Sequence, residues 1–328
     1  MSTTSTSDHV VCYTADINFL MPSIFSAKSL RGFVAKAQID IYIFLFHDTS
    51  EHQSALDKLI PKLAEDRIFL VITSPSLLEN VDTTIFDKGH IPVAAVGRFF
   101  LDELLPPQYQ HIIYLDGDTW INSDPSKLLF THIPYPKVAL CNDYAAFEGA
   151  IWRNKFRHYW SGIKQGNGHN YFNSGVFAAS RSAWRVIARQ AYEYLLQHPK
   201  LCIYHDQSAL NAIVNDKRLH LSLRWNFQST FKYLHLDQEI QPVISHFTRR
   251  PKAWQGPVFP WIEQYWLIEN IKKEFADFDL PLQSMALQRA HKVSKQKEMK
   301  TSLFKNKLIR WLTRQVTGIN KYEKLAEI

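Results

Sequence analysis

The chain has 328 residues, of which 46% are hydrophobic and 21% are charged. This composition excludes a disordered chain, and the length suits one large α/β domain with additions or two smaller domains. The formal net charge is +7, but residues 289–328 hold 11 Lys and Arg against three acids, so residues 1–288 are nearly neutral at −1. A neutral body argues against a broad nucleic-acid groove, and we expect no nucleic-acid partner.

Three sequence features bear on the cellular compartment. The N-terminal segment MSTTSTSDH is polar and lacks the layout of a signal peptide. No apolar run approaches the roughly 18 residues that span a bilayer. The three cysteines, Cys12, Cys141 and Cys202, form no zinc-ligand pattern and no expected disulfide framework. We therefore expect a cytoplasmic protein in a reducing compartment.

Strand and helix patterns alternate along the chain. The first half predicts strands at 9–15, 39–46, 68–72 and 111–115 and helices at 21–30, 51–65 and 94–105. The second half predicts an irregular stretch at 147–170, strands at 137–141, 171–178, 219–224 and 242–247, and helices at 182–197, 206–215 and 261–275. This alternation predicts an α/β fold with a mostly parallel sheet and helices on both faces, in which ligands bind at the carboxyl ends of the strands. No GxGxxG fingerprint or GxxxxGK[ST] loop is present, so a Rossmann oxidoreductase and a P-loop NTPase are poorly supported.

The triplet Asp116-Gly117-Asp118 follows the strand expected at 111–115. In an extended chain the side chains of residues i and i+2 point the same way, so the two carboxylates repel one another unless a cation lies between them. Oxygen ligands of this kind suit Mg²⁺ or Mn²⁺. The alternative is a solvated Asp-Gly turn at the end of a strand, and the triplet alone is common by chance.

His246 ends another expected strand and precedes the basic segment Arg249-Arg250-Pro251-Lys252. An imidazole that completes a two-carboxylate site favours Mn²⁺ over Mg²⁺. The basic side chains are suited to hold a diphosphate bridged by the same metal. The alternatives are a structural histidine and a solvated basic loop.

Other polar residues are expected at strand ends and at a helix start. Asn173 lies where a glycine interrupts an apolar strand, and its amide can both donate and accept hydrogen bonds. Asp206 and Gln207 begin a predicted helix, although an aspartate there is more often a cap. The set is completed by residues that follow predicted strands, which are Asp143, Asp16 and Asn18.

The order of these segments resembles glycosyltransferase family 8, the retaining lipopolysaccharide galactosyl- and glucosyltransferase and glycogenin group. The resemblance covers about residues 8–255 and rests on Tyr13-Thr14-Ala15-Asp16-Ile17-Asn18, Gly97-Arg98, Tyr114-Leu115-Asp116-Gly117-Asp118, Phe172-Asn173-Ser174-Gly175-Val176, Asp206-Gln207, Trp225-Asn226 and His246 through Trp254. It implies a nucleotide-diphospho-sugar transferase fold of the GT-A type over 8–282, followed by a basic C-terminal helical tail over 283–328.

The resemblance also implies roles for individual residues. On the donor side, Asp16 and Asn18, with Ala15 beside them, resemble residues near the uracil and ribose of a UDP-sugar, and Arg98 resembles an arginine that faces the donor. Asp116, Gly117 and Asp118 match the metal-binding triplet, in which the two aspartates are ligands and His246 is the third.

On the sugar side, Asn173, Asp206 and Gln207 resemble the residues beside the transferred sugar. Asp143 is similar to an aspartate near the donor sugar or the acceptor, and Lys252 is similar to the lysine on the pyrophosphate. Two positions depart from the family pattern, because Arg249 stands where a glycine is usual and Ala253 stands where a proline is usual.

The activity that the resemblance implies is retaining transfer of a hexose, glucose or galactose, from a UDP-sugar to a saccharide acceptor. Mn²⁺ is the expected metal and Mg²⁺ the alternative. A lipid-linked glycan such as lipopolysaccharide core is the expected acceptor, with the 147–170 stretch as our candidate for contact with it. The same residues would also suit a metal-dependent nucleotide-sugar hydrolase or phosphodiesterase, which acceptor dependence distinguishes. A non-catalytic membrane-surface protein is a third alternative, and the intact set of metal ligands argues against it.

The tail is expected to form a basic amphipathic helix. On a wheel of 100° per residue, Lys307, Arg310 and Arg314 lie apart from an apolar arc of Phe304, Leu308, Ile309, Trp311, Leu312 and Val316. Such a helix is typical of an interfacial anchor on an anionic membrane, which would place the protein peripherally on the inner face. The alternative is a helix that packs its apolar face on the body and leaves its charges in solvent.

Overall fold

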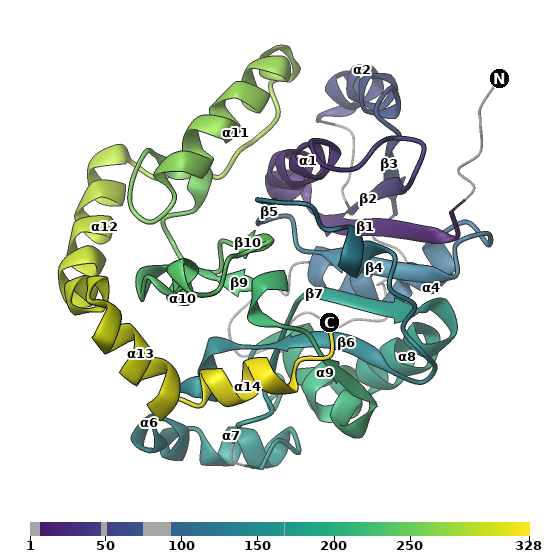
Figure 1. Cartoon of the computed structure of the whole chain (residues 1–328). Coiled ribbons are helices and arrows are strands. Elements are labelled where there is room, and N and C mark those ends of the chain that lie inside the picture. The colour runs from purple at the N-terminus through teal and green to yellow at the C-terminus, as the bar shows by residue number, and fades with distance from the viewer. Residues whose placement is uncertain (1–6, 47–50, 75–92, 167) are drawn as a thin grey trace.

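The computed structural model describes residues 7–46, 51–74, 93–166 and 168–328. Segment 1–6, which carries most of the argument against a signal peptide, lies outside these residues. At the centre is a seven-stranded sheet in the order β3-β2-β1-β4-β7-β6-β8 (Figure 1). Its strands are β1 (His9–Ala15), β2 (Asp40–Phe46), β3 (Ile68–Thr73), β4 (His111–Leu115), β6 (Val138–Asn142), β7 (Phe172–Ser180) and β8 (Arg218–His220). Only β7 runs against its neighbours in this sheet, so the prediction of a mostly parallel sheet is confirmed.

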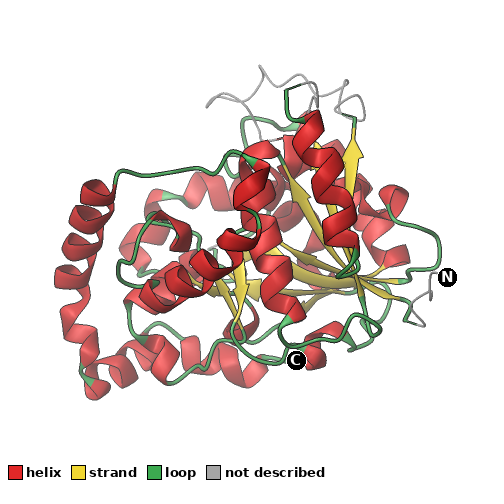
Figure 2. Ribbon diagram, turned by 90° about the horizontal axis from the view of Figure 1, so that it is seen from above, coloured by secondary structure: helices red, strands yellow, loops and turns green. Residues whose placement is uncertain are grey.

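Helices cover both faces of this sheet because its strands bury side chains on both sides. Val11 and Tyr13 of β1 pack toward α1 (Ile17–Arg31) and α2 (Gln53–Ala64). Val10 and Cys12 point to the other face, which is covered by α8 (Arg181–Gln197) and α9 (His205–Val214). Figure 2 shows the strands enclosed between these layers of helices. The expected α/β layering is therefore confirmed.

A second, three-stranded sheet has the order β5-β10-β9. It contains β5 (Thr119–Ile121), β10 (Ile244–His246) and β9 (Phe227–Gln228). In the antiparallel pair of β5 and β10, His246 lies opposite Thr119. This register brings His246 beside Asp118, which is 128 residues away in the sequence.

The first helix, α1, begins at Ile17, four residues before its predicted start at Met21. The side chain of Asp16 accepts a hydrogen bond from the backbone N–H of Phe19 at 3.0 Å, which caps α1. Pro22 consequently lies inside α1 instead of in its first residues. Gly32 follows the end of this helix, as expected.

Two other predicted segments differ from the structure. The single helix expected at 94–105 is divided into α3 (Val93–Gly97), the 3₁₀ turn η3 (Arg98–Phe100) and α4 (Leu101–Leu104). The stretch 147–170 is not irregular throughout, because it contains α6 (Ala150–Lys155) and α7 (Arg157–Gly162), while residue 167 lies outside the description. Tyr159 and Trp160 of α7 are buried, with the Trp160 ring 4.9 Å from that of Tyr171. One helical turn that buries aromatic residues is too short to give a periodic signal.

The C-terminal region leaves the body and returns to it (Figure 1). After α11 (Ile262–Glu274), the chain forms α12 (Leu287–Thr301), the turn η10 (Ser302–Lys305), α13 (Lys307–Val316) and α14 (Ile319–Leu325). Tyr322 of α14 is buried, and its hydroxyl accepts hydrogen bonds from the backbone of Asn142 at 3.0 Å and the guanidinium of Arg218 at 3.1 Å. The short helices α5 (Ser126–Leu129) and α10 (Ser229–Tyr233) complete the α-helices of the described chain. Among these described helices, none is both long and apolar enough to cross a membrane.

Candidate active site

The carboxyl end of β4 carries Asp116, and Asp118 directly precedes β5. The backbone N–H of Asp116 donates to the carbonyl of Gly175 on the neighbouring strand β7 at 2.7 Å. A Cβ on Gly175 would lie 2.5 Å from Oδ2 of Asp116 and 2.3 Å from Cε1 of His246. The glycine that interrupts the apolar strand is therefore required for these two side chains to approach β7.

Asp116, Asp118 and His246 form a cluster of potential metal ligands, with one ligand atom from each lying within 4.8 Å of the others. Nε2 of His246 is 3.1 Å from Oδ1 of Asp118 and 3.6 Å from Oδ2 of Asp116. The other ring nitrogen, Nδ1, is 2.9 Å from Oδ1 of Asn226, whose amide nitrogen donates to Asn173. This network assigns the proton of a neutral imidazole to Nδ1 and directs the lone pair of Nε2 toward both carboxylates.

This donor set fits a divalent cation. Two carboxylates and a neutral imidazole lone pair directed at the same point repel one another, and a cation between them removes the repulsion. One nitrogen and two oxygen ligands suit Mn²⁺. Asn226 orients the imidazole through its second nitrogen, as carbonyl groups do for metal-bound histidines in general.

Basic side chains compensate the charge of the two aspartates. Nη2 of Arg98 lies 2.9 Å from Oδ1 of Asp116, and Nζ of Lys252 lies 2.6 Å from Oδ2 of Asp118. Burial opposes ionisation of Asp118, but the ammonium of Lys252 outweighs it and holds the pKa of Asp118 well below its usual value. The sequence indicated the repulsion between the two carboxylates but not their ion pairs with Arg98 and Lys252.

Arg98 also connects the metal cluster to Asp206 at the start of α9. Its Nη1 lies 3.0 Å from Oδ2 of Asp206, and the hydroxyl of Ser174 donates to the same carboxylate oxygen at 3.0 Å. Burial raises the pKa of Asp206 above its usual value, although Arg98 partly offsets this effect. Asp206 is therefore a buried carboxylate that depends on Arg98 for its charge balance.

A second polar group lines the same cavity as Asp206 and consists of Asn173, Asp143 and Gln207. The amide nitrogen of Asn173 lies 3.1 Å from both Oδ2 of Asp143 and Oε1 of Gln207. The amide nitrogen of Gln207 donates to the hydroxyl of Tyr171 at 2.9 Å. The structure thus brings together all four residues that the sequence assigned to the sugar side.

Two cavities meet at the metal cluster and share Arg98, Asp116 and Asp118 in their linings. The larger cavity, about 560 Å³, is also lined by Asp143, Asn173, Asp206, Gln207 and His246. The smaller, about 230 Å³, is also lined by Asp16 and Gly117. The cluster therefore lies between a space lined by the predicted sugar-side residues and a space lined by predicted donor-side residues.

Some of the predicted donor-side residues do not line either of these two cavities. Ala15 is fully buried in β1 and Asn18 is exposed on α1, and neither lines the described part of the two cavities. Lys252 reaches the site through Asp118. Arg249 lines the larger cavity, and its Nε donates to the hydroxyl of Thr230 at 2.8 Å.

Three further residues belong to the site without having been predicted there, which are Asn226, Ser174 and Tyr114. The hydroxyl of Tyr114 donates to Oδ1 of Asp116 at 3.0 Å, and the guanidinium of Arg98 lies over its ring at 4.6 Å. All three residues lie within the segments that carry the family resemblance, so those segments could have identified them as site residues. Within the described part of 147–170, the residues that line the larger cavity are Glu148 and Trp160.

The fold is shared with solved glycosyltransferase structures. The galactosyltransferase LgtC, solved with donor and acceptor sugar analogues, superposes with a TM-score of 0.62 at 19% identity, over 80% of this chain and 95% of that chain. Its likeness confirms the expected GT-A fold.

Several curated relatives have a higher sequence identity to this chain than LgtC has. General stress protein A of Bacillus subtilis is 28% identical over 209 residues, which cover 57% of this chain and 69% of that protein. The lipopolysaccharide 1,2-glucosyltransferase of Escherichia coli is 24% identical over 272 residues, covering 78% and 75% of the two chains. The match to probable galacturonosyltransferase-like 5 of Arabidopsis thaliana, at 26% identity, spans 53% of this chain and about half, 49%, of that relative.

The family model described as glycosyl transferase family 8 matches residues 10–256, which is about three quarters of the chain and includes every residue of the metal cluster and both cavity linings described above. The chain belongs to glycosyl transferase family 8.

Proposed function

We propose that this protein is a metal-dependent retaining glycosyltransferase that moves a hexose, glucose or galactose, from a UDP-sugar to a saccharide acceptor. The observation that carries the proposal is the position of the cluster of Asp116, Asp118 and His246 at the junction of two cavities. Asp116, Asp118 and His246 would hold the metal, and a donor that extends across the junction would place its diphosphate beside these three residues. Mn²⁺ is the proposed ion, and Mg²⁺ is the alternative for the same ligands.

On the donor side we assign binding roles to residues near the smaller cavity. Asp16 and Gly117 line it, and Ala15 and Asn18 flank it on β1 and α1. Lys252 adds a positive charge to the metal cluster, which suits it to the departing diphosphate. A metal held by the cluster would supply positive charge to neutralise the charge that develops on the diphosphate when the glycosidic bond breaks.

On the sugar side we assign catalytic roles to Asn173, Asp206, Gln207 and Asp143. The bond from the anomeric carbon to the diphosphate oxygen breaks, a bond to the acceptor oxygen forms, and the acceptor proton leaves to the diphosphate. The transition state is oxocarbenium-like, so the carboxylate of Asp206 and the amide oxygen of Gln207 stabilise its positive charge. Arg98 and Ser174 hold the Asp206 carboxylate in place.

We further propose that residues 8–282 form the catalytic domain and that Glu148, which lines the larger cavity at the start of the 147–170 stretch, contacts the acceptor. A lipid-linked cell-surface glycan is the proposed acceptor class, which the name of the lipopolysaccharide glucosyltransferase relative supports. The glucosyl and galactosyl donors remain alternatives because both sugars suit the same polar lining.

A panel of nucleotide sugars, each with Mn²⁺ and with or without saccharide acceptors, tests this function by release of UDP. We expect one UDP-hexose to be consumed rapidly with acceptor and slowly without it. Complete consumption without acceptor would identify a nucleotide-sugar hydrolase instead. NMR of the fresh product checks retention, since an α-linked donor should give an α-glycoside and a β anomeric proton contradicts the assignment.

The tail supports a second part of the proposal, which is peripheral attachment to an anionic membrane. Asn306 caps α13 through its side chain, so Phe304, which was expected on the same helix, lies before it in η10. Arg310, expected on the solvated basic side, is buried and pairs with Glu239 at 2.8 Å. The apolar side chains instead face solvent, with Leu308, Trp311, Leu312 and Val316 between 46% and 85% exposed.

This orientation is opposite to a helix that packs its apolar face on the body. Lys305 and Lys307 are exposed close to the apolar side chains, and Lys300 precedes them on α12. A surface that combines exposed Trp and Leu with nearby Lys matches an interfacial contact, to which each surface-proximal base adds about 1 kcal/mol on acidic lipid. A glycosyltransferase with a lipid-linked acceptor meets that acceptor at such a surface.

Co-sedimentation with acidic and neutral vesicles tests the attachment without truncating the chain. The double variant Trp311→Ser and Leu312→Ser should lose most binding to acidic vesicles. The matched control is Trp266→Ser on α11, where Trp266 is 58% exposed and the binding should be retained. Equal binding of all three proteins would show that α13 is not the anchor.

A further inference from the structure

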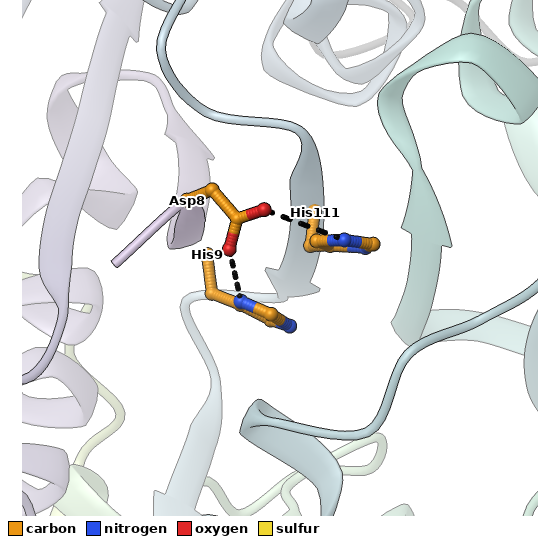
Figure 3. A group of neighbouring side chains, drawn as sticks. All are labelled: Asp8, His9 and His111. Carbon is orange, nitrogen blue, oxygen red and sulfur yellow. Dashed lines mark hydrogen bonds and ion pairs between the residues drawn. The ribbon is translucent and has the colours of Figure 1, made fainter. Parts of the chain in front are cut away.

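A second cluster of histidine and aspartate side chains lies at the opposite end of β4 from the active site. Asp8 precedes β1, His9 begins β1, and His111 begins β4 (Figure 3). One ligand atom from each lies within 4.8 Å of the others. β1 and β4 are parallel and paired, with His9 directly opposite His111, so their amino ends bring these side chains together.

The distances within the cluster are close to those of a metal site. Oδ1 of Asp8 lies 2.9 Å from Nδ1 of His9, and Oδ2 lies 3.7 Å from Nε2 of His111. A fourth side chain approaches from the loop after α5, because Nδ1 of His132 lies 3.3 Å from Nε2 of His111. Neighbouring ligands of a tetrahedral zinc ion, at bond lengths of 2.0–2.2 Å, lie about 3.3–3.6 Å apart.

We propose that Asp8, His9, His111 and His132 bind Zn²⁺. Imidazole nitrogens with one carboxylate favour Zn²⁺ over the Mg²⁺ or Mn²⁺ that suits carboxylate-rich sites. His9 and His111 are largely buried, whereas Asp8 is 54% exposed and gives the ion a path from solvent. The His9 and His111 rings stack at 4.3 Å, so ligation turns both rings about their Cβ–Cγ bonds toward the ion.

The backbone of the site is already in place before an ion binds. The carbonyl of Asp8 accepts hydrogen bonds from the backbone N–H groups of Gln110 at 2.7 Å and His111 at 3.0 Å. Nε2 of His9 and Nδ1 of His111 are buried without a hydrogen-bond partner among the described residues, so the fold itself does not use up the hydrogen-bonding capacity of these rings. A bound ion would join the first residues of β1 to β4 and stabilise the N-terminal end of the sheet.

Co²⁺ substitution tests the proposal on the full chain, because four-coordinate Co²⁺ absorbs visible light strongly and six-coordinate Co²⁺ absorbs weakly. The wild-type protein should show the strong band and retain Zn²⁺ after dialysis. Asp118→Asn should keep this band, because Asp118 belongs to the other cluster. The double variant His9→Asn and His111→Gln should lose it.

His132→Ala provides a second variant that does not disturb the core, because His132 is exposed. It should weaken Zn²⁺ binding at least 10-fold, because the loss of a direct ligand costs no less than the loss of an outer-shell partner, and it should leave UDP release unchanged. In the wild-type protein, Zn²⁺ at 100 times its dissociation constant should raise Tm by roughly 4 °C. A band that disappears in Asp118→Asn, a band that persists in the His9 and His111 double variant, or binding only at millimolar Zn²⁺ would overturn the proposal.

Discussion

The two ends of β4 carry clusters of similar residue types that the fold holds very differently. At the carboxyl end, the atoms not directed at the proposed metal are bonded to neighbours, with Asp118 held by Lys252 and His246 held by Asn226. At the amino end, Asp8 is half-exposed, and the remote ring nitrogens of His9 and His111 have no hydrogen-bond partner in the described structure. Burial is the main factor that lowers the pKa of both histidines.

The difference shows what supporting contacts contribute. A site whose ligands are fixed before the metal arrives keeps its geometry through each round of substrate binding. A site whose ligands lack such partners can take its geometry from the metal and serve stability. The following predictions test this contrast in order of decreasing effect.

Asp118→Asn should lower kcat/KM about 10³-fold or more, because Lewis-acid stabilisation of the leaving group is worth several kcal/mol and each 1.4 kcal/mol is a factor of ten. It should also destabilise the fold by about 3 kcal/mol, since Lys252 stays buried without its carboxylate. UDP release and urea denaturation measure the two effects. The double variant Asp118→Asn and Lys252→Met should recover much of the stability and none of the activity, and full activity of either variant in EDTA contradicts the metal assignment.

Asn226→Ala should weaken Mn²⁺ binding by about 10- to 100-fold, because Asn226 orients the His246 ring. Activity measured across a range of Mn²⁺ concentrations should show a raised requirement for the ion and substantial recovery at saturation. A loss of activity that no Mn²⁺ concentration reverses would mean that Asn226 acts on the sugar side, through its contact with Asn173, instead.

His220→Gln tests a half-buried histidine that belongs to neither cluster. Burial, and then Arg218, lower the pKa of His220 to about 4. The unfolded chain takes up the proton near pH 6.5, so wild-type stability should fall as the pH drops from about 6.5 to about 4. The variant should reduce this loss by about 1 kcal/mol, a figure discounted for the partial exposure of the ring. Thermal unfolding between pH 4 and 7 measures the difference, and identical pH profiles would rule out this contribution.

Asp8→Asn should have the smallest effect. In EDTA it should change the free energy of unfolding by no more than about 0.5 kcal/mol, as expected of an exposed side chain outside the core. With Zn²⁺ present, the same variant should lose the stabilisation that the ion gives to the wild-type protein. Chemical denaturation with and without Zn²⁺ makes the comparison. A large loss of stability in EDTA would show that Asp8 is held in place by the fold itself.

The strand pattern predicted the sheet and the carboxylates at the end of β4, because these depend on short segments of sequence. The position of His246 depends on pairing between β5 and β10, and no local pattern encodes a register between residues more than 100 positions apart. The family resemblance supplied that contact instead. Asn226 was missed as a functional residue for the same reason, since its role exists only through His246 and Asn173.

The amino-end cluster was missed although its signal is local. The expectation that ligands bind at the carboxyl ends of strands directed attention to Asp16, Asp116 and Asp143. The amino ends of parallel neighbours also meet at one edge, and His9 and His111 are the first residues of β1 and β4. The start of α1 was placed too late because Pro22 was taken as a first-turn residue, whereas the cap is Asp16.

The return of the tail to the sheet fixes the reach of the proposed anchor. The buried Tyr322 is bonded to residues of β6 and β8, and Arg310 ties α13 to Glu239. α13 is therefore clamped to the body at its middle and just beyond its end, instead of trailing on a flexible linker. A molecule attached through α13 would hold its catalytic cavity at a set height and tilt above the lipid. The length of an acceptor, as well as its chemistry, would then decide which glycans are extended.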